Sequence, residues 1–322
     1  MNQKKIASPK YPLQKDTDAH TVAQHTSQEP TIKQLLLKAI DIHKYRLSPR
    51  SIQGYQSVID VFCEKNKDLN ACQLNTYKII EYSDKLTALA YKGKTVNFHI
   101  STLKTLFNVL IIRGLLKSDN PCTNVPRLKS VSVGYDYFPT NIVIFLAKNI
   151  PQIDPQVWLA AQFIYYCCLR PKQELRQLKI SDINLEAKKI TVCSENSKNG
   201  KRQQVSIPDE FVEILYKSGI NNYPINYYVF GKKGVPSNFA LGKNNLSARH
   251  QKILKKLGLD TKFYKLYSWK HTAAYNAVMA NIPIKMIQLQ LRHHAIAQTD
   301  VYLQRMGINA SSQFYSGFKM VY

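Results

Sequence analysis

Apolar residues recur at helical spacing from residue 31 onward, after a polar start. Residues 1–30 show no periodicity and contain three prolines, which predicts a flexible arm. Two later stretches place apolar side chains three and four residues apart: Ile52, Tyr55, Val58, Ile59 and Phe62, then Val96, Ile100, Leu103, Phe107, Leu110 and Ile111. Further helices are expected at 31–46 and 73–87. Together these helices predict a compact four-helix domain over residues 31–117.

The pattern changes at residues 118–139, which hold Pro121, Pro126 and Pro139 and show little periodicity. This composition predicts a linker. A second domain, 140–322, then begins with helical pattern at 141–148 and 156–168. Two strands joined by a polar turn are expected at 188–194 and 202–208. Helices resume at 209–217, 246–257, 267–280, 283–291 and 296–304, so we expect a mainly α domain around a small β-hairpin.

Charge adds a prediction about partners. The 322 residues carry 45 Lys and Arg against 21 Asp and Glu, a net charge of +24. The segment 214–322 is the most lopsided, with 15 basic residues and only Asp260 and Asp300 acidic. An ordinary solvated face mixes both signs, so this imbalance favours contact with nucleic acid. The scarcity of carboxylates argues against a nuclease that depends on Mg²⁺, and we expect no metal or other cofactor.

Other features exclude several classes of protein. No run of about 18 apolar residues occurs, so no membrane-spanning helix is expected. The first residues are basic but lack an apolar stretch behind them, so they do not form a signal peptide. The six cysteines lack the spacing of metal sites and are expected to be reduced thiols. These features predict a cytoplasmic protein.

Four short stretches of the second domain carry the candidate chemistry. They are LRPKQELRQLKISDINL (169–185), SKNGKRQQVSIP (197–208), LYSWKHT (266–272) and LRHHAIAQTDVYLQ (291–304). In this order and spacing they resemble the tyrosine recombinase, or phage integrase, family. The box Tyr-x-x-Lys-His-Thr is similar to that of integrases from Bacteroidetes mobile elements. The resemblance covers essentially the whole chain after residue 30.

The resemblance implies a fold and an activity. Residues 31–117 would be the family's four-helix, SAM-like core-binding domain, and residues 140–322 its mostly α catalytic domain. The protein would be a site-specific recombinase that cleaves and rejoins duplex DNA through a 3′-phosphotyrosine intermediate. Its two domains would clamp the DNA, and a homotetramer would act on two DNA sites, with a DNA-bending host factor as a further partner. The residues after Tyr302 would dock on a neighbouring protomer.

Tyr302 is the predicted nucleophile. A tyrosine hydroxyl, with a pKa of about 10, can attack a phosphodiester as a phenolate and leave again. His293 lies nine residues before it and Thr299 three before it, which matches the family's Leu-Gly-His pattern except that Arg292 replaces the glycine. Without this frame, Tyr302 would be one of 20 tyrosines packing a helix. The frame makes His293 a predicted hydrogen-bond donor to a non-bridging phosphate oxygen, or a proton carrier near neutral pH.

Arg170 and Lys198 are further predicted catalytic residues by resemblance. Arg170 follows an apolar run, and a guanidinium there can form two bonds to a phosphate. The family usually places a glutamate three residues later, whereas Glu174 is four residues later, which suggests a one-residue insertion. A structural Arg170–Glu174 pair is the alternative, with Arg176 as the replacement arginine. Lys198 would protonate the 5′ leaving oxygen, and the neighbouring Lys201 is the alternative.

The third box departs most from the family form, His-x-x-Arg-His. Tyr267 stands at the first histidine position and Lys270 at the arginine position, followed by His271. Lysine keeps the positive charge that a phosphorane needs but loses the forked geometry of arginine. Two alternatives follow: a DNA-binding relative with decayed catalysis, or a relaxing enzyme resembling type IB topoisomerases. A covalent DNA adduct would exclude the first, and site choice would exclude the second.

Overall fold

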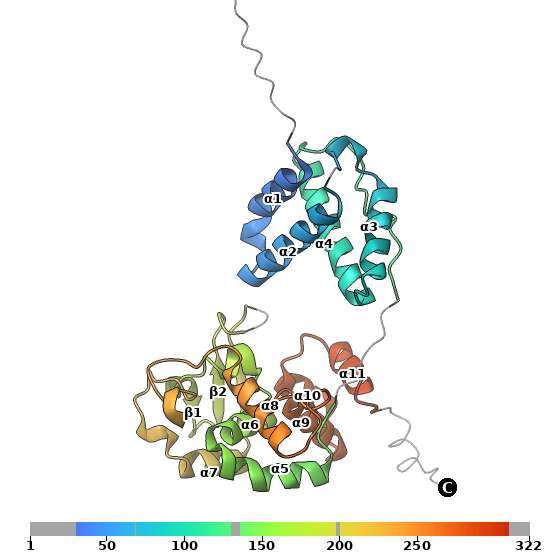
Figure 1. Ribbon diagram of the computed structural model, residues 1–322. Helices are drawn as coiled ribbons and strands as arrows, with labels where there is room; N and C mark the ends of the chain where they lie inside the picture. Colours follow the sequence, from blue (N-terminus) through green and yellow to red (C-terminus); the bar gives the residue numbers. More distant parts are fainter. Residues whose placement is uncertain (1–29, 68, 130–135, 198–199, 309–322) are drawn as a thin grey trace, which may run out of the picture. The chain divides into compact units, whose positions relative to one another are not determined.

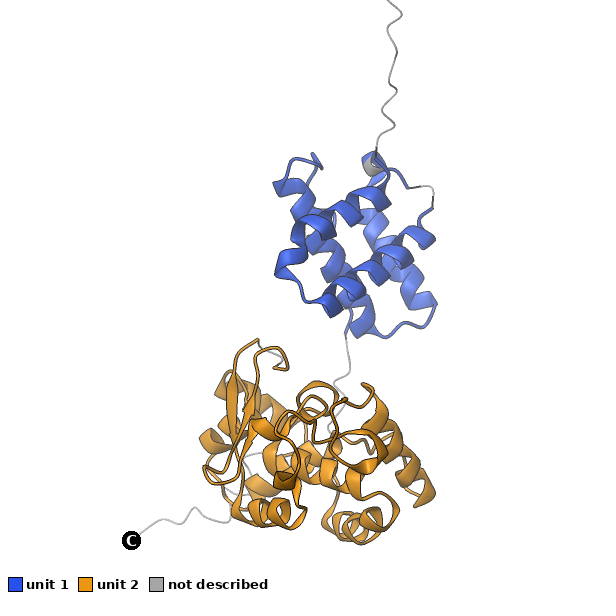
Figure 2. Ribbon diagram, turned by 90° about the vertical axis from the view of Figure 1, so that its left-hand side faces the viewer, with its two compact units in different colours: residues 1–131 blue, residues 132–322 orange. Residues whose placement is uncertain are grey.

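The chain divides into two compact units, Met1–Val131 and Ser132–Tyr322 (Figure 2). The computed structural model describes residues 30–67, 69–129, 136–197 and 200–308. The expected flexible arm, 1–30, lies outside this part apart from Pro30. The structure confirms a mostly helical protein with one small sheet.

Unit 1 contains α1 (Ile32–His43), α2 (Pro49–Lys65), α3 (Thr76–Ala88) and α4 (Gly93–Ile112), the four helices expected from periodicity (Figure 1). Local chemistry sets where they begin. Thr31 forms a capping box with Gln34, and the Ser48 hydroxyl accepts from the backbone N–H of Ser51 ahead of α2. The apolar faces meet in one core whose fully buried members include Leu36, Ile59, Phe62, Ile79, Tyr82, Leu86, Leu103 and Phe107.

Helix α4 is long and apolar enough to cross a membrane by length and composition alone. It also contacts α1, α2 and α3 within unit 1. The buried His99 of this helix shares a hydrogen bond of 2.7 Å with the Tyr82 hydroxyl. A helix that exchanges buried polar contacts with its neighbours in this way is the core helix of a bundle.

The segment expected to be a linker is anchored at both of its described ends. The Asn97 side chain of α4 bonds both the N–H and the carbonyl of Leu128, at 3.0 and 2.8 Å. On the other side, the Phe138 N–H donates to Thr272 Oγ1 at 2.9 Å, and the Phe138 ring stacks on Tyr264. Residues 130–135 lie outside the described part.

Unit 2 opens with α5 (Thr140–Ile153) and α6 (Pro155–Cys167), followed by a small antiparallel sheet. The two expected strands are β2 (Lys189–Val192) and β3 (Gln203–Ser206), with Ile190 opposite Val205. A two-residue strand that sequence reasoning missed, β1 (Ile183–Asn184), adds to the other edge of β2. Then come α7 (Asp209–Lys217), α8 (Asn245–Lys256), α9 (Ser268–Met279), α10 (Ile284–Leu291) and α11 (Ile296–Gln304).

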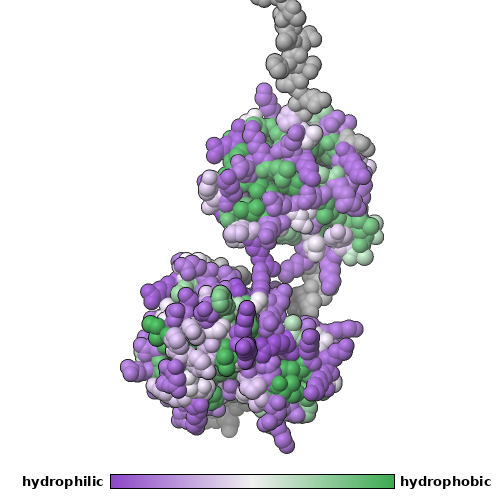
Figure 3. Space-filling model, turned by 60° about the vertical axis from the view of Figure 1, so that its left-hand side comes forward, coloured by the Kyte–Doolittle hydropathy of each residue, from purple (hydrophilic) through white to green (hydrophobic). Residues whose placement is uncertain are grey.

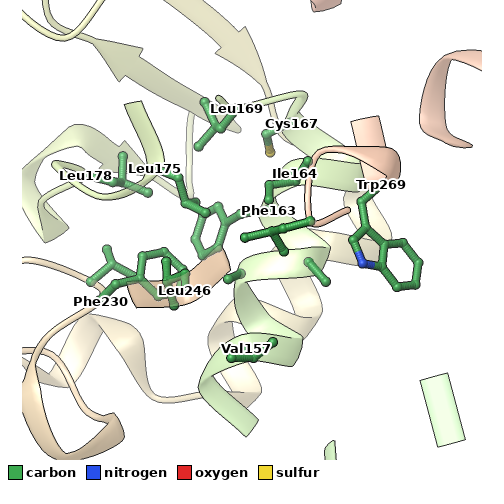
Figure 4. Packing of buried hydrophobic residues seen from close by; sticks show 14 of the residues in the cluster. Val157, Phe163, Ile164, Cys167, Leu169, Leu175, Leu178, Phe230, Leu246 and Trp269 are labelled. Atoms are coloured by element: carbon green, nitrogen blue, oxygen red, sulfur yellow. The ribbon is translucent and has the colours of Figure 1, made fainter. Parts of the chain in front are cut away.

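Helix α6 is the central element of unit 2. Val157, Phe163, Ile164 and Cys167 on this helix are all fully buried, because neighbours cover it on several sides. Figure 4 shows these side chains among Leu175, Phe230, Leu246 and Trp269, which come from the loops and helices around it. Outside this core the visible face of the molecule is largely hydrophilic, with scattered hydrophobic patches (Figure 3). The packing fixes the C-terminal end of α6, where the candidate site forms.

Candidate active site

The C-terminal end of α6 is where distant segments of unit 2 meet. Cys168 caps this helix in a left-handed conformation, with φ 52° and ψ 31°. Its carbonyl oxygen accepts hydrogen bonds from Lys270 Nζ at 2.7 Å and from Arg292 Nη2 at 3.0 Å. The last carbonyls of a helix lack partners within the helix and carry partial negative charge, so cations are favourable ligands for them. The helix end thereby holds two basic side chains at one place.

A buried carboxylate, Glu174, joins the two arginines of this cluster. It accepts from the Arg170 N–H at 2.8 Å, from the Arg170 guanidinium, and from Arg292 Nη2. The Glu174 side chain is fully buried, whereas the Arg170 side chain keeps 21% of its surface exposed. The arrangement therefore extends beyond the simple helix pair, because Arg292 shares the carboxylate. Arg176, the alternative arginine, donates to the Leu241 carbonyl instead.

A π-turn connects Arg170 to Glu174, where the resemblance suggested one extra residue. Pro171–Leu175 forms one turn of π-helix, and the Leu175 N–H donates to the Arg170 carbonyl at 3.0 Å, five residues back. Such turns accommodate single extra residues and occur often at functional sites. The turn returns Glu174 to the arginine despite the altered spacing, which explains how the carboxylate keeps its contact.

Arg292 ends α10 in the left-handed conformation, with φ 56° and ψ 47°. The family pattern has glycine at this place, and a residue with a side chain costs about 1–2 kcal/mol more there. Hydrogen bonds of the guanidinium to Glu174 and to the carbonyls of Cys167 and Cys168 offset that cost. The conformation directs the Arg292 side chain into the cluster.

Lys270 is buried within the cluster, with only 1% of its surface exposed. Besides the Cys168 carbonyl, its Nζ donates to the Leu291 carbonyl at 3.3 Å. Burial lowers the pKa of the Lys270 ammonium to about 7, and the nearby Arg292 and Arg170 act in the same direction. The structure thus places Lys270 on main-chain carbonyls beside the arginines.

The cluster carries an excess of positive charge. Arg170, Lys270 and Arg292 contribute up to three charges, and in the described part of the chain the one carboxylate bonded to them is that of Glu174. A phosphodiester is an anion of complementary charge, and arginine matches its geometry. The end of α6 can therefore bind a phosphate and stabilise the charge that develops on it during reaction.

Tyr302 lies on α11 beside this cluster. Its hydroxyl is 2.5 Å from His271 Nδ1, and the Tyr302 side chain shares an apolar cluster with Cys168 and Leu291. Burial lowers the pKa of the His271 imidazole to about 4, with Lys270 adding to the effect. His271 was not among the predicted site residues. Its adjacency to Lys270 in the box YSWKHT was the signal that could have found it.

His293 also faces Tyr302. Its ring lies 5.2 Å from the Tyr302 ring in an edge-to-face arrangement. His293 Nδ1 pairs with the Thr299 hydroxyl at 2.9 Å, and Thr299 is fully buried. The threonine three residues before the tyrosine therefore fixes the orientation of the histidine ring. Spacing along the chain could not reveal this contact.

A cavity of about 670 Å³ opens beside Arg170. Tyr267 lines it together with Lys172, Lys265 and Asn244. Tyr267 also stands edge-on to His271, with the ring centres 5.0 Å apart. The structure thus brings five of the six predicted site residues to one region: Arg170, Tyr267, Lys270, His293 and Tyr302. The sixth, Lys198, lies outside the described residues.

No metal-binding cluster occurs in the described ranges, since no group of three or more His, Cys, Asp or Glu side chains converges there. The six cysteines, all within those ranges, are free thiols. The site consists of three basic side chains, the carboxylate of Glu174, two histidines and two tyrosines.

Comparison with known proteins decides the family. Residues 148–306 match the Phage integrase family, and residues 32–129 match the Phage integrase N-terminal domain. The chain belongs to the phage integrase family. It is a site-specific tyrosine recombinase, an enzyme that cleaves and rejoins DNA strands. This assignment confirms the resemblance seen in the four boxes, and it favours neither a decayed relative nor a topoisomerase.

Individual relatives are distant but cover most of this integrase. A tyrosine recombinase of Agathobacter rectalis is 22% identical over 80% of this chain and 86% of its own length. The Tn1549 transposon integrase, solved in complex with transposon right end DNA, superposes with a TM-score of 0.72 at 15% identity, over 89% of this chain and 98% of its own. A lambda integrase tetramer bound to a Holliday junction superposes with a TM-score of 0.69 at 17% identity, over 88% of this chain and 80% of its own.

Proposed function

We propose that Tyr302 is the nucleophile of this recombinase. In strand cleavage its hydroxyl oxygen attacks the scissile phosphorus, a P–O bond to Tyr302 forms, and the bond to the 5′ oxygen breaks. The products are a 3′-phosphotyrosine and a free 5′-hydroxyl. Attack by the 5′-hydroxyl of another strand reverses the step on a new partner. Bond energy is kept in the covalent link, so no nucleotide cofactor is needed.

The observation that carries this proposal is the position of the Tyr302 hydroxyl next to the cationic end of α6. Arg170, held by Glu174 and facing the cavity, would bind the scissile phosphate. Lys270 and Arg292 would add positive charge behind it, and His293 would donate a hydrogen bond to a non-bridging oxygen. Lys198 is proposed to protonate the departing 5′ oxygen, and Tyr267 to line the phosphate-binding side.

A nicked DNA site provides the test of the nucleophile. The fragment beyond the nick diffuses away after cleavage, so the covalent adduct accumulates and can be seen on a denaturing gel. Tyr302→Phe should abolish the adduct and leave DNA binding nearly unchanged, because only the attacking oxygen is lost. Tyr216→Phe, at an exposed tyrosine of α7, is the matched control. Adduct formation by Tyr302→Phe would refute the assignment.

We propose duplex DNA as the partner of both units, which would form a clamp around it. The basic residues are spread over both, with 16 in residues 31–136 and 25 in residues 137–322. Residues 31–117 would be the core-binding domain and 140–322 the catalytic domain. A DNA-bending host factor, a mobile element as the source, and the bacterial cytoplasm as the location belong to the same proposal.

A homotetramer on two DNA sites is the proposed working unit. The lambda integrase that this chain resembles in fold was solved as a tetramer on a Holliday junction. The segment 309–322, which lies outside the described residues, would dock on a neighbouring protomer. Deleting 309–322 should leave single-site binding intact but abolish pairing of two sites, measured by native gel mobility.

A further inference from the structure

We propose that His271 accepts the proton of Tyr302 during strand cleavage and returns it during strand joining. The inference rests on the proposed role of Tyr302 as nucleophile. It adds a catalytic residue, since His271 contacts the reacting oxygen itself. In this scheme the proton moves from the hydroxyl to His271 Nδ1 as the bond from oxygen to phosphorus forms. In joining, the bond breaks and the same proton returns to the tyrosine oxygen.

The geometry meets the first requirement for a general base, which is hydrogen-bond reach of the proton it removes. The 2.5 Å between His271 Nδ1 and the Tyr302 hydroxyl oxygen lies at the short end of such contacts. The proposal requires the neutral tautomer with the ring proton on Nε2, in which Nδ1 accepts the hydrogen bond from the Tyr302 hydroxyl. The pair spans α9 and α11, and both residues are largely buried.

The two other residues near Tyr302 are less suited to this task. His293 directs Nδ1 to the Thr299 hydroxyl and meets the Tyr302 ring edge-to-face, so its Nδ1 is already engaged. Tyr267 occupies the position where the family pattern has histidine, and a phenol is a poor proton acceptor near neutral pH. The chain thus lacks a histidine at that position and has one in contact with the nucleophile.

The groups around His271 keep its imidazole unprotonated, so that it can accept a proton. Lys270 precedes it on α9, the Tyr267 ring packs against it, and Tyr302 faces it from α11. The charged and titratable groups that act on Lys270 in turn are Arg170, Arg292, Glu174 and the buried thiol of Cys168. Burial and Lys270 both lower the pKa of His271, so its nitrogen is unprotonated at neutral pH. A bound phosphodiester acts in the opposite sense and stabilises the imidazolium as the proton arrives.

Single-turnover cleavage of a nicked site, measured from pH 6 to 9, tests the proposal on the full-length protein. With a base in place the rate should not rise with pH, and loss of the Lys270 proton, whose pKa is about 7, should lower the rate at the upper end of this range. Without one, the phenolate must come from ionisation of Tyr302, so the rate should rise about tenfold per pH unit toward the phenol pKa of about 10. His271→Asn keeps an acceptor oxygen where Nδ1 lies but cannot take the proton. It should cleave about 10²–10⁴-fold more slowly at pH 7 and show the tenfold slope.

His294→Asn is the matched control, because His294 is an exposed histidine outside the contact. It should match the parent in rate and in pH profile. Thermal melting and DNA binding of each variant separate loss of folding from loss of chemistry. A His271→Asn protein that cleaves within threefold of the parent with the same pH profile would overturn the proposal.

The pH profile of the unaltered protein provides an independent test. A tenfold rise per pH unit in the parent itself would show that no base acts, and would refute the role of His271 without any variant. Failure of the Tyr302 assignment is separately visible as adduct in Tyr302→Phe, and it would remove the basis of the His271 proposal as well.

Discussion

Replacing Glu174 by glutamine isolates the contribution of the buried carboxylate. The substitution keeps the shape of the side chain and removes its negative charge. Glu174 is fully buried and bonded to both Arg170 and Arg292. Glutamine also turns one acceptor into an N–H₂ donor that faces the donors of a guanidinium. We therefore expect a loss of stability and not merely a loss of activity.

The magnitude follows from the burial of the partners. The Arg292 side chain keeps 2% of its surface exposed, so water cannot replace the lost carboxylate. Removing one partner of a buried ion pair costs about 3–5 kcal/mol, because the other charge is left uncompensated. For a unit of about 190 residues, each kcal/mol lowers the midpoint of thermal unfolding by roughly 2–4 °C. The expected decrease for unit 2 is therefore about 6–20 °C.

Differential scanning calorimetry of the full-length protein is the assay, since it can resolve the unfolding of the two units. Glu213→Gln is the control, because the Glu213 side chain is 72% exposed in its pair with Lys217 and should change the stability by less than about 0.5 kcal/mol. A specific DNA site should restore part of the loss in Glu174→Gln, since its phosphate supplies negative charge to Arg170, whose side chain is 21% exposed. If Glu174→Gln unfolds within about 1 kcal/mol of the parent, the carboxylate does not hold the cluster together and the argument fails.

Four further predictions follow from the same site. Lys270→Ala should lower single-turnover cleavage about 10²–10³-fold. Lys270→Arg should restore only part of the rate, because Lys270 is buried and a guanidinium is larger than the ammonium it replaces; parental rates for Lys270→Ala would contradict this. The pKa of Lys270 is about 7 in the folded protein and 10.5 for the free side chain. Between these pH values the unfolded chain binds one more proton than the folded protein, so the free energy of unfolding should rise with pH from 7 to 10. Urea titrations of Lys270→Met should show a smaller rise. DNA affinity should fall roughly 10³-fold or more between 50 and 200 mM salt if six or more phosphates are contacted, and a flat titration would argue against a clamp. Cleavage should persist in EDTA, and loss of activity that Mg²⁺ restores would indicate a metallonuclease.

Periodicity was enough to predict most of the helices and both long strands, because each pattern is local. Ile52 to Phe62 and Val96 to Ile111 fall within α2 and α4, and the hairpin register places Ile190 against Val205 as alternation requires. β1 was missed because two residues are too few to show a period. β1 forms by pairing with β2, and nothing in the two residues of β1 indicates that partner.

Sequence reasoning named five residues that the structure places in the candidate site, but it missed His271 and did not reveal the contacts between them. The family pattern supplied Arg170, His293 and Tyr302, whereas the contact of Tyr302 with His271 joins residues 31 positions apart in the sequence. The burial of Lys270 could not be foreseen either, since a lysine in a helix is normally exposed. Lys270 is buried because its ammonium binds a carbonyl at the end of α6, and the sequence pattern does not show that this carbonyl lies nearby.

The order in which the site's parts appear along the chain has a consequence for its synthesis. Arg170 and Glu174 come first, Lys270 and His271 about 100 residues later, and Tyr302 last, on α11. Unit 1 precedes them all. A chain still being made therefore acquires most of its basic residues, and the proposed proton acceptor, before the proposed nucleophile. If Tyr302 is the nucleophile, the capacity to cut DNA arises only when the last helix of the site has folded against α9 and α10.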